Sequence, residues 1–433
     1  MTPAARLSAA IEILAAIEAQ RIPAPNALKE WGTAHRFAGS GDRAAIAGLV
    51  FDTLRRRSSS AWLMEAETPR ARLIGMLRLE RGLSTEAIAA LCDGGRFAPG
   101  ALTDTERAAL TARTLDDAHA SIAGDYPEWL DPHLAAVFGD DRAAEATAMA
   151  SRAPLDLRVN TLKAKRDKVL ASMAHLGAQP TPWSPWGLRI ALPADARNPG
   201  IHSEEDFIKG GVEVQDEGSQ LAALLTVAKP GEQVIDLCAG AGGKTLALAA
   251  MMQGKGRLIA TDGDKRQLAP IHERLSRAGV HNAEIRTPRG ADDPLADIRS
   301  SADLVLIDAP CTGTGTWRRN PDAKWRMRPG ALEVRLKDQA EVLARAAGLV
   351  KPGGRIVYVT CSVLTEENGG QVRGFADRRP EFAVVPPAQV ASALGDRADE
   401  FLAATLQSPE GLLMTPRRTG TDGFFVSVLC KAG

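Results

Sequence analysis

Hydrophobic positions in the first third of the chain recur at the spacing of an α-helix. The period is seen at Leu7, Ile11, Leu14 and Ile17, and again over 44–54, 73–79 and 86–91. Prolines and glycines separate these stretches, and no alternating strand pattern interrupts them. We therefore expect residues 1–135 to form an all-helical domain.

The pattern changes between residues 140 and 212. Residues 155–159 and 188–192 alternate apolar and polar side chains, as half-buried strands do. Three prolines and two tryptophans lie between these runs, within 180–186, and predict a loop. We expect residues 140–212 to form a small mixed subdomain that also serves as a linker.

From residue 213 onward, short β-rich runs alternate with helical stretches. The runs are 233–238, 257–262, 302–308 and 355–360, and the helical stretches include 265–278 and 332–350. This alternation predicts an α/β fold with a parallel, doubly wound, Rossmann-like sheet over 213–433. Residues 423–429 predict a last strand on or beside that sheet. Ligands of such sheets bind beyond the carboxyl ends of the strands.

Composition limits the class of protein. The chain has 433 residues, which suits two to four domains, with 53 basic and 53 acidic residues. This balance argues against a nucleic-acid binder held by bulk charge, although it leaves room for a local basic groove. No run of about 18 apolar residues and no signal-peptide pattern is present, so we expect a cytoplasmic protein without a membrane partner. The five cysteines contain no CxxC motif, which disfavours disulfides and a metal site. A monomer is our default expectation.

The first β-rich run ends in a glycine-rich loop, Asp236-Leu-Cys-Ala-Gly-Ala-Gly-Gly-Lys-Thr245. A Walker A loop needs glycine where Cys238 stands, and a dinucleotide fingerprint needs glycine at Thr245, so both fail on spacing. Asp262 ends the next run, where a carboxylate can accept hydrogen bonds from ribose hydroxyls. This arrangement fits a nucleoside without a pyrophosphate, of which S-adenosylmethionine is the common one. For the glycines alone, a plain tight turn is the alternative.

Two cysteines follow two further strands. Cys311 lies in Asp308-Ala-Pro-Cys311, and Cys361 lies in Thr360-Cys-Ser362. A single cysteine is more often a small buried hydrophobe. We interpret Cys92 and Cys430 as structural. Two cysteines just beyond neighbouring strands, at the ligand edge of one sheet, are hard to explain as packing. Cysteine chemistry needs a thiolate and a partner group within reach.

These motifs together resemble the Sun-type, RsmB-like family of RNA 5-methylcytosine methyltransferases. The resemblance covers about 155–430 and is carried by 158–163, 214–220, 236–245, 308–311, 360–362, 366–368 and 421–425. The paired cysteine motifs make it specific. The helical first domain is similar, in pattern more than in motif, to the NusB-like RNA-binding domain of some bacterial members.

The resemblance implies roles for four residues. Cys361 is the nucleophile that adds to carbon 6 of cytosine, and Cys311 assists release of the enzyme. DNA cytosine methyltransferases instead attack with the Pro-Cys cysteine and carry a Glu-Asn-Val motif, which is absent from the corresponding strand end here. Asp308 and Lys244 contact the base; a turn cap is the alternative for Asp308, and a solvated helix residue for Lys244.

The resemblance also implies S-adenosylmethionine as the cofactor. The expected binding residues are Cys238, Ala239, Gly240, Ala241, Gly242, Gly243, Lys244, Asp262 and Asp308. One departure concerns the adenine, because the family's Gly-Asp pair after the third strand is missing from 285–294. Arg289, Asp292 and Asp293 are the alternatives, and the adenine contacts stay open.

A local excess of positive charge lies between Trp317 and Asp338. Seven basic residues face three acidic ones there, and two tryptophans, Trp317 and Trp325, are interleaved. We expect this segment, which follows Cys311, to contact phosphates and stack on bases; a solvated loop and helix is the alternative. We interpret the arginine run 55–57 as the solvated end of a helix.

The leading hypothesis is S-adenosylmethionine-dependent methylation of cytosine carbon 5 in RNA, with small-subunit (16S) ribosomal RNA as the substrate. One alternative is a transfer RNA methyltransferase with the same mechanism. The other is a catalytically idle RNA-binding or ribosome-assembly factor, against which the intact Cys311, Cys361, Asp308 and Lys244 argue.

Overall fold

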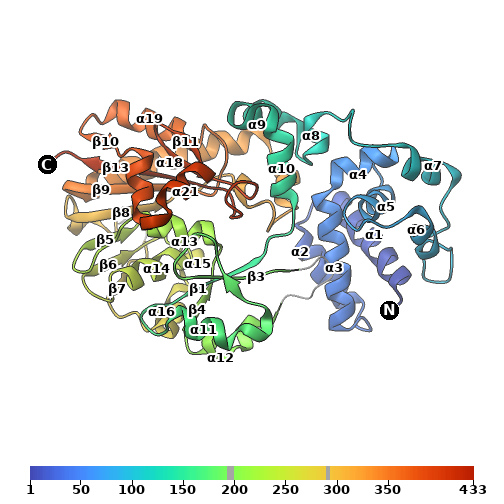
Figure 1. Cartoon of the computed structure of the whole chain (residues 1–433), viewed down its shortest axis with the longest axis horizontal. Helices are drawn as coiled ribbons and strands as arrows, with labels where there is room; N and C mark the ends of the chain where they lie inside the picture. The colour runs from blue at the N-terminus through green and yellow to red at the C-terminus, as the bar shows by residue number, and fades with distance from the viewer. Residues whose placement is uncertain (193–198, 289–292) are drawn as a thin grey trace. The chain divides into compact units, whose positions relative to one another are not determined.

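The chain folds into two compact units, each made from separate stretches of sequence. The computed structural model describes residues 1–192, 199–288 and 293–433 (Figure 1). Unit 1 contains Met1–Ala153, Leu192–Asn198 and Trp317–Met327, and unit 2 contains Pro154–Ala191, Pro199–Thr316 and Arg328–Gly433. Among the described residues, no helix is both long enough and apolar enough to cross a membrane.

The first part of unit 1 is all-helical, as predicted. Its helices are α1 (Pro3–Gln20), α2 (Ala24–Ala34), α3 (Ser40–Arg55), α4 (Arg57–Met64), α5 (Pro69–Leu79), α6 (Thr85–Leu91), α7 (Asp104–Ala112), α8 (Ala120–Ala123), α9 (Asp131–Phe138) and α10 (Arg142–Ala150). Hydroxyl side chains cap four N-termini, at Thr2, Thr68, Ser84 and Thr103. The periodic positions form one core, in which Ile13, Ile46 and Ile74 are fully buried.

The predicted small mixed subdomain is a four-stranded antiparallel sheet with strand order β2-β3-β1-β4. Its strands are β1 (Leu155–Val159), β2 (Gln179–Pro180), β3 (Gly187–Ile190) and β4 (Val212–Val214), and α11 (Arg166–Ser172) and α12 (Glu205–Ile208) accompany them. β1 coincides with the predicted strand.

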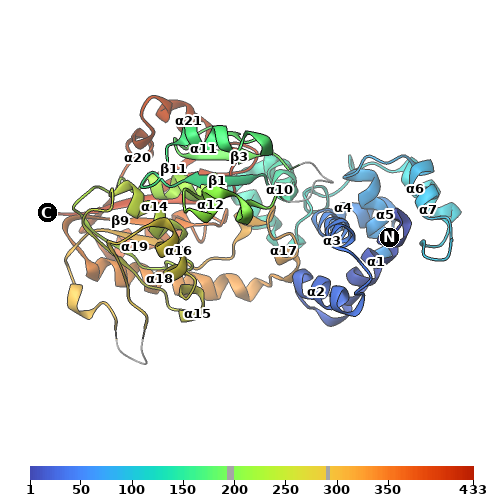
Figure 2. The same cartoon turned by 90° about the horizontal axis from the view of Figure 1, so that it is seen from below.

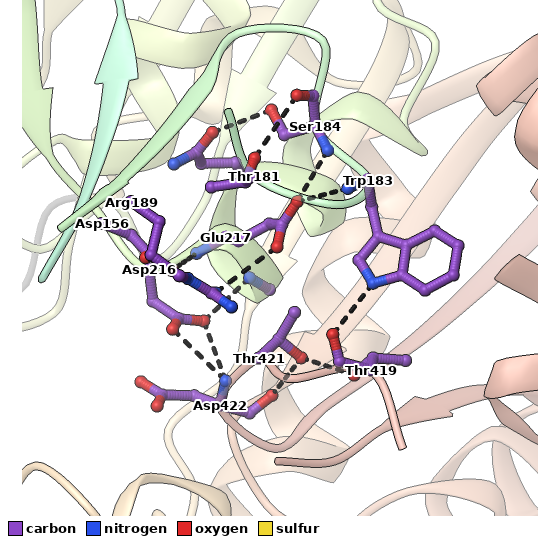
Figure 3. Close-up of polar contacts among 12 residues, drawn as sticks. Asp156, Thr181, Trp183, Ser184, Arg189, Asp216, Glu217, Thr419, Thr421 and Asp422 are labelled. Atoms are coloured by element: carbon purple, nitrogen blue, oxygen red, sulfur yellow. Dashed lines mark hydrogen bonds and ion pairs between the residues drawn. The ribbon is translucent and has the colours of Figure 1, made fainter. Parts of the chain in front are cut away.

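Buried polar contacts tie this sheet to α13 (Glu217–Leu224), the helix that precedes β5. The Glu217 carboxylate accepts hydrogen bonds from the backbone N–H groups of Trp183 and Ser184, at 2.6 and 2.8 Å (Figure 3). Arg189 forms a bidentate pair with Asp156 at 2.7 Å and also reaches Glu217. Burial raises the pKa of Glu217. The hydrogen bonds that the carboxylate accepts and the charge of Arg189 oppose this rise. The loop at 181–186 is therefore held by fixed polar partners.

The large sheet of unit 2 has the strand order β11-β12-β13-β9-β8-β5-β6-β7, with β10 paired to β13. Its strands are β5 (Gln233–Asp236), β6 (Arg257–Ala260), β7 (Ala283–Ile285), β8 (Ala302–Asp308), β9 (Val350–Thr360), β10 (Phe382–Val384), β11 (Leu406–Ser408), β12 (Gly411–Met414) and β13 (Phe424–Lys431). Strands β9, β8, β5, β6 and β7 pair in parallel. The prediction of a parallel sheet is correct for these strands only.

The remaining strands are antiparallel, so the sheet is mixed. The predicted last strand, β13, lies in the sheet and runs antiparallel to both β9 and β12. No crossover helix separates β12 from β13, and a short connection of that kind joins antiparallel strands. The expected helix over 265–278 is divided into α15 (Lys265–Leu268) and α16 (Ile271–Ala278), because Pro270 cannot continue the helical hydrogen bonding.

Helices cover both faces of the parallel strands. α14 (Gly243–Met251) follows β5, and α18 (Pro329–Leu349) leads into β9; they lie on opposite sides of the strands (Figure 2). Further helices are α19 (Gly369–Arg378), α20 (Pro387–Ala391) and α21 (Ala398–Ala404). From β5 the strands continue to β6 and β7 on one side, and from β8 they continue to β9 on the other side. The strand order therefore reverses between β5 and β8. A ligand crevice is expected at that reversal, beyond the strand ends.

Candidate active site

The structure brings Cys311 and Cys361 together at the carboxyl ends of β8 and β9. These strands are parallel neighbours, with Asp308 opposite Val359 in the register. The two sulfur atoms are 3.4 Å apart, and both side chains are partly accessible. This arrangement agrees with the prediction that the two strand-end cysteines lie at one edge of the sheet.

Backbone contacts fix the two cysteine loops against each other. Gly315 donates its N–H to the carbonyl of Cys361 at 2.9 Å, and Gly423 donates to the carbonyl of Gly315 at 2.8 Å. A Cβ atom on Gly315 would lie 2.3 Å from the carbonyl oxygen of Gly423. Only glycine permits this approach, so the loop after Cys311 is packed directly against the start of β13.

The environment of Cys311 favours its neutral thiol. The pKa of Cys311 is raised well above its ordinary value, first by its hydrogen bond with Cys361 and then by burial, with the charges of Cys361 and Glu367 adding to the effect. Two adjacent thiols share one proton more readily than both ionise. Cys311 is therefore the thiol of the pair that is held in its neutral form.

Asp308 and Lys244 form an ion pair beside the thiols. Lys244 Nζ lies 2.7 Å from Asp308 Oδ2, and its cation also lies 5.1 Å from the ring centre of Phe424. The Lys244 side chain is 6% exposed and that of Asp308 is 34% exposed. Asp308 is therefore the accessible partner of this ion pair, and Lys244 is the buried one.

The glycine-rich loop connects β5 to α14 and contains Cys238, Ala239, Gly240, Ala241 and Gly242, with Gly243 and Lys244 in the first turn of α14. Gly242 has φ +86°, and a Cβ atom there would lie 2.4 Å from Ile271. Asp262 accepts a hydrogen bond from the N–H of Gly240 at 2.9 Å. The loop residues predicted from the sequence thus form one turn, closed against the end of β6. Burial raises the pKa of the Cys238 thiol well above its ordinary value, which makes this thiol a packing group.

Three carboxylates influence one another around this loop. Asp236 is fully buried; Thr245 donates to its Oδ2 at 2.7 Å, and its Oδ1 has no partner among the described residues. Burial, with smaller contributions from the charges of Asp308 and Asp262, raises the pKa of Asp236 to about 7. A buried acceptor without a donor, near two further acids, suits a cationic ligand. The sulfonium and ammonium groups of S-adenosylmethionine match that requirement.

The residues considered for the adenine are only partly described. Arg289 and Asp292 lie outside the described residues. Asp293 accepts a hydrogen bond from Arg345 on α18 at 2.7 Å and one from the backbone of Leu295. Asp293 is therefore engaged in local contacts, and the adenine contacts stay open.

The basic segment after Cys311 differs from the prediction. Trp317–Met327 belongs to unit 1, where Trp317 is 2% exposed and Lys324 is 0% exposed. Lys324 Nζ donates to the carbonyl of Arg55 at 3.1 Å, and Trp325 Nε1 donates to the carbonyl of Leu54 at 2.7 Å. The prediction that Trp317 and Lys324 contact RNA is therefore wrong.

The physical reason lies at the end of α3. The last carbonyls of a helix have no partner within it, and the side chains of Lys324 and Trp325 supply donors to two of them. Arg55, which we expected to be solvated, is 6% exposed and donates to the carbonyl of Arg318 at 2.6 Å. Burial lowers the pKa of Lys324 to about 7, and the nearby charge of Asp125 opposes this shift.

Unit 1 also contains a cavity of about 660 Å³. Its lining includes Trp62, Trp325, Arg57, Arg72 and Arg113. The guanidinium of Arg57 lies 5.3 Å from the ring centre of Trp325, and that of Arg113 lies 5.0 Å from the ring centre of Trp62. Aromatic faces with arginines beside them are suited to unpaired nucleobases.

Family models match the chain in two places. A model described as 16S rRNA methyltransferase RsmB/F matches residues 223–430. A second model, described as the ferredoxin-like domain of RsmF/B-like methyltransferases, matches residues 126–197 and so includes β1 to β3.

Individual relatives agree with these matches. The ribosomal RNA small subunit methyltransferase B of Sodalis glossinidius is 34% identical over 310 residues, which cover 71% of this chain and 66% of the relative, just under two thirds of its length. The crystal structure of PH0851 is 26% identical, covers 99% of both chains and has a TM-score of 0.72. The structure of NSun6 from Pyrococcus horikoshii with SFG is 21% identical, covers 71% of this chain and 98% of that one, and shares the fold with a TM-score of 0.59.

Proposed function

The chain belongs to the RsmB/F family of 16S rRNA methyltransferases, and from this premise we propose that it methylates carbon 5 of cytosine in small-subunit ribosomal RNA, with S-adenosylmethionine as methyl donor. The observation that carries the proposal is the pair of thiols 3.4 Å apart, at the ends of two neighbouring strands. The reaction needs one sulfur to attack and a second group beside it to assist release.

Cys361 is the proposed nucleophile. Its sulfur forms a bond to carbon 6 of cytosine, and the electron pair of the 5,6 double bond moves to make carbon 5 nucleophilic. S-adenosylmethionine supplies an electrophilic methyl group on its sulfonium centre. Carbon 5 takes the methyl group, and S-adenosylhomocysteine is the leaving group. A base then removes the carbon 5 proton, the double bond re-forms and the carbon–sulfur bond breaks, which returns Cys361 as a thiolate.

Cys311 is proposed to take part in the release step. Its pKa is raised first of all by the hydrogen bond with Cys361, and the charge of Cys361 adds to this. Both contributions disappear when the Cys361 sulfur is bonded to carbon 6, because that sulfur then carries no charge. The pKa of Cys311 consequently falls at the stage when a base is needed for the carbon 5 proton.

Asp308 and Lys244 are proposed to recognise and polarise the base. The partly exposed carboxylate of Asp308 can accept hydrogen bonds from the exocyclic amine and from the protonated ring nitrogen of cytosine. Protonation at the ring nitrogen helps thiolate addition, because it offsets the negative charge that addition brings to the ring. Lys244 orients the Asp308 carboxylate through the 2.7 Å ion pair.

The glycine-rich turn is proposed to hold S-adenosylmethionine. The backbone of 238–243 provides close approach, Asp262 provides an acceptor for the ribose hydroxyls, and Asp236 Oδ1 provides a buried acceptor without a present donor. The three acids around the turn complement a cationic ligand.

Unit 1 is proposed to contact RNA through its cavity. Trp62 and Trp325 offer partly exposed ring faces, and the arginines beside them can contact phosphate or base edges. The target cytosine must be unstacked or single-stranded to reach the thiols. A second RNA contact at the cavity would add affinity without taking part in the reaction.

Bisulfite sequencing of total RNA from cells with and without the gene tests the proposal. Loss of one protected cytosine in 16S ribosomal RNA upon deletion supports reaction and substrate together. Loss of a protected cytosine in transfer RNA keeps the chemistry and replaces the substrate. If every protected cytosine survives the deletion, the proposed activity is overturned in favour of an idle binding factor.

A further inference from the structure

A buried carboxylate that the proposed chemistry does not use lies between the two cysteine loops. Glu367 is 0% exposed and lies in the loop between β9 and α19. Among the described residues, no lysine, arginine or histidine lies within ion-pair distance of it. Burial of an acid without a counter-ion costs several kcal/mol, so its hydrogen bonds must compensate.

Four donors surround the Glu367 carboxylate. Oε1 accepts from the backbone N–H of Thr312 at 2.8 Å and from Nε2 of Gln339 at 3.0 Å. Oε2 accepts from the hydroxyl of Thr312 at 2.5 Å and from the hydroxyl of Ser362. The two oxygens offer about four acceptor positions, and four donors occupy them. The carboxylate is thus satisfied without a cation.

The identity of these donors connects the contacts to the chemistry. Thr312 directly follows Cys311, and Ser362 directly follows Cys361. Gln339, on α18, also donates to the carbonyl of Pro310 at 2.9 Å, so the Cys311 turn is braced on both sides. One carboxylate therefore fixes the residue after each thiol, and no other described side chain bonds to both of these neighbours.

We propose that Glu367 is a positioning residue of the methyl transfer, which sets the separation of the Cys311 and Cys361 sulfurs by holding Thr312 and Ser362. The inference rests on the proposed function and adds a residue to it. Glu367 touches neither sulfur; it acts through the backbone of the two loops. Its negative charge also adds to the rise in the pKa of Cys311.

Positioning of the two thiols by Glu367 affects release more than it affects addition and methyl transfer. Addition and methyl transfer use the Cys361 sulfur alone, whereas release needs Cys311 beside it. We call the hydrogen bonds from Thr312, Ser362 and Gln339 to Glu367 the Glu367 clasp. Weakening this clasp displaces the two thiols relative to each other, so it slows release more than addition. Covalent protein–RNA adduct should therefore accumulate in a variant whose clasp is weakened, and a purely structural role would not produce it.

The test uses the full-length protein with Glu367→Gln, which keeps the shape but turns one acceptor oxygen into a donor. We expect kcat to fall about 10- to 100-fold, as for a misplaced catalytic group, and KM for RNA to fall with it, because slow release after methyl transfer leaves kcat/KM nearly unchanged. A slow-migrating adduct with 16S RNA should appear on a denaturing gel. Ser362→Ala and Thr312→Val each remove one hydroxyl donor and should show a smaller accumulation in the same direction.

Glu232→Gln is the matched control. Glu232 pairs with Arg355 at 2.9 Å, and it precedes β5, at the opposite end of the sheet from the thiols. This variant should lose stability without accumulating adduct. Wild-type turnover at Glu367→Gln, or a loss of activity that follows the folded fraction with no adduct, overturns the role of Glu367. If Glu367→Gln does not fold, the same readouts on Ser362→Ala and Thr312→Val decide the matter.

A Cys311→Ala lane on the same gel separates the two proposals. If Cys311→Ala gives adduct and none of Glu367→Gln, Ser362→Ala and Thr312→Val does, the positioning role of Glu367 alone is overturned. An empty Cys311→Ala lane beside an inactive wild type overturns the proposed methylation, and the role of Glu367 with it.

Discussion

The sulfur atoms of Cys311 and Cys361 lie 3.4 Å apart although 50 positions separate the two residues along the chain. The strands that carry them, β8 and β9, are parallel neighbours, and α18 provides the crossover between them. A pair at this distance titrates as one unit. The hydrogen bond with Cys361 and burial raise the pKa of Cys311 and hold it neutral, which leaves Cys361 as the sulfur that we propose as the nucleophile.

Replacement of each cysteine should stop the reaction at a different point. Cys361→Ala should abolish methylation and give no covalent RNA species, because no sulfur adds to carbon 6. Cys311→Ala should accumulate a methylated protein–RNA adduct, because addition and methyl transfer proceed while release stalls. The measurement is a denaturing gel with RNA and S-adenosylmethionine labelled at the methyl group. Cys430→Ala, at an exposed position, should behave as wild type. Turnover by Cys361→Ala would contradict the assignment.

The cysteine pair could be predicted from the sequence because its geometry follows from topology. Short β-rich runs that alternate with helices define a parallel sheet, and every strand of such a sheet ends at the same edge. Cys311 and Cys361 follow two of those runs, so the pattern alone places them together. The helical first domain and the strands β1 and β3 of the small subdomain were predictable because their periodicity is local, whereas β2 and β4 were not predicted.

Other features depend on partners distant in the sequence. The docking of Lys324 and Trp325 depends on unpaired carbonyls at the end of α3, which no pattern within 317–338 reveals. A count of basic residues measures charge and not burial, so it did not show that Trp317 and Lys324 are buried while Arg326, Arg328 and Lys337 are exposed. The Glu367 clasp was missed because its four donors come from three separate segments. The antiparallel strands of the large sheet were missed because alternation does not give strand direction.

The affinity for S-adenosylmethionine should rise with pH. The pKa of Asp236 is raised to about 7, so this carboxyl is protonated and neutral below pH 7 and charged above it. A cationic ligand binds the charged form and lowers that pKa, so binding releases a proton below pH 7. One such group makes Kd about tenfold lower at pH 8 than at pH 6.

Titration calorimetry at pH 6, 7 and 8 measures this dependence. Asp236→Asn removes the titrating group while it keeps the side-chain shape, so its Kd should be higher at pH 8 and nearly flat across the range. The Thr245 hydroxyl can still donate to the amide oxygen of that variant. An unchanged slope in Asp236→Asn would assign the titration to another group and remove Asp236 from the ligand site.

Trp62→Ala should weaken RNA binding without slowing the bound enzyme. Stacking of one base on one aromatic ring contributes about 1–3 kcal/mol, so Kd should rise about fivefold or more. Filter binding or anisotropy with 16S RNA fragments measures the change, and single-turnover methylation at saturating RNA should stay near the wild-type rate. Trp129→Ala is the matched control, since Trp129 is a partly buried tryptophan of unit 1 outside the cavity lining. An equal loss in both variants would argue against stacking in the cavity.

Lys324→Ala should destabilise unit 1, and the loss should depend on pH. The substitution leaves the carbonyl of Arg55 without its donor, which costs about 1–3 kcal/mol, and it removes the amino group that lies 6.0 and 5.0 Å from the ring centres of Trp317 and Trp325. The pKa of Lys324 is lowered from 10.5 to about 7 in the folded protein. Between pH 7 and 10 the unfolded chain therefore binds more protons at this position than the folded chain, and this residue's contribution to stability rises with pH.

Lys324→Ala lacks that rise, so the difference in unfolding free energy from wild type should be larger at pH 9 than at pH 6.5, by about 2–3 kcal/mol. Urea unfolding at the two pH values measures it, and Lys337→Ala, an exposed lysine on α18, should change little at either. A difference that shrinks as the pH rises would mean that Lys324 gains more from its charge near Asp125 than it loses by burial. In that case the segment would be held by an ion pair, and its docking would weaken when Lys324 loses its proton.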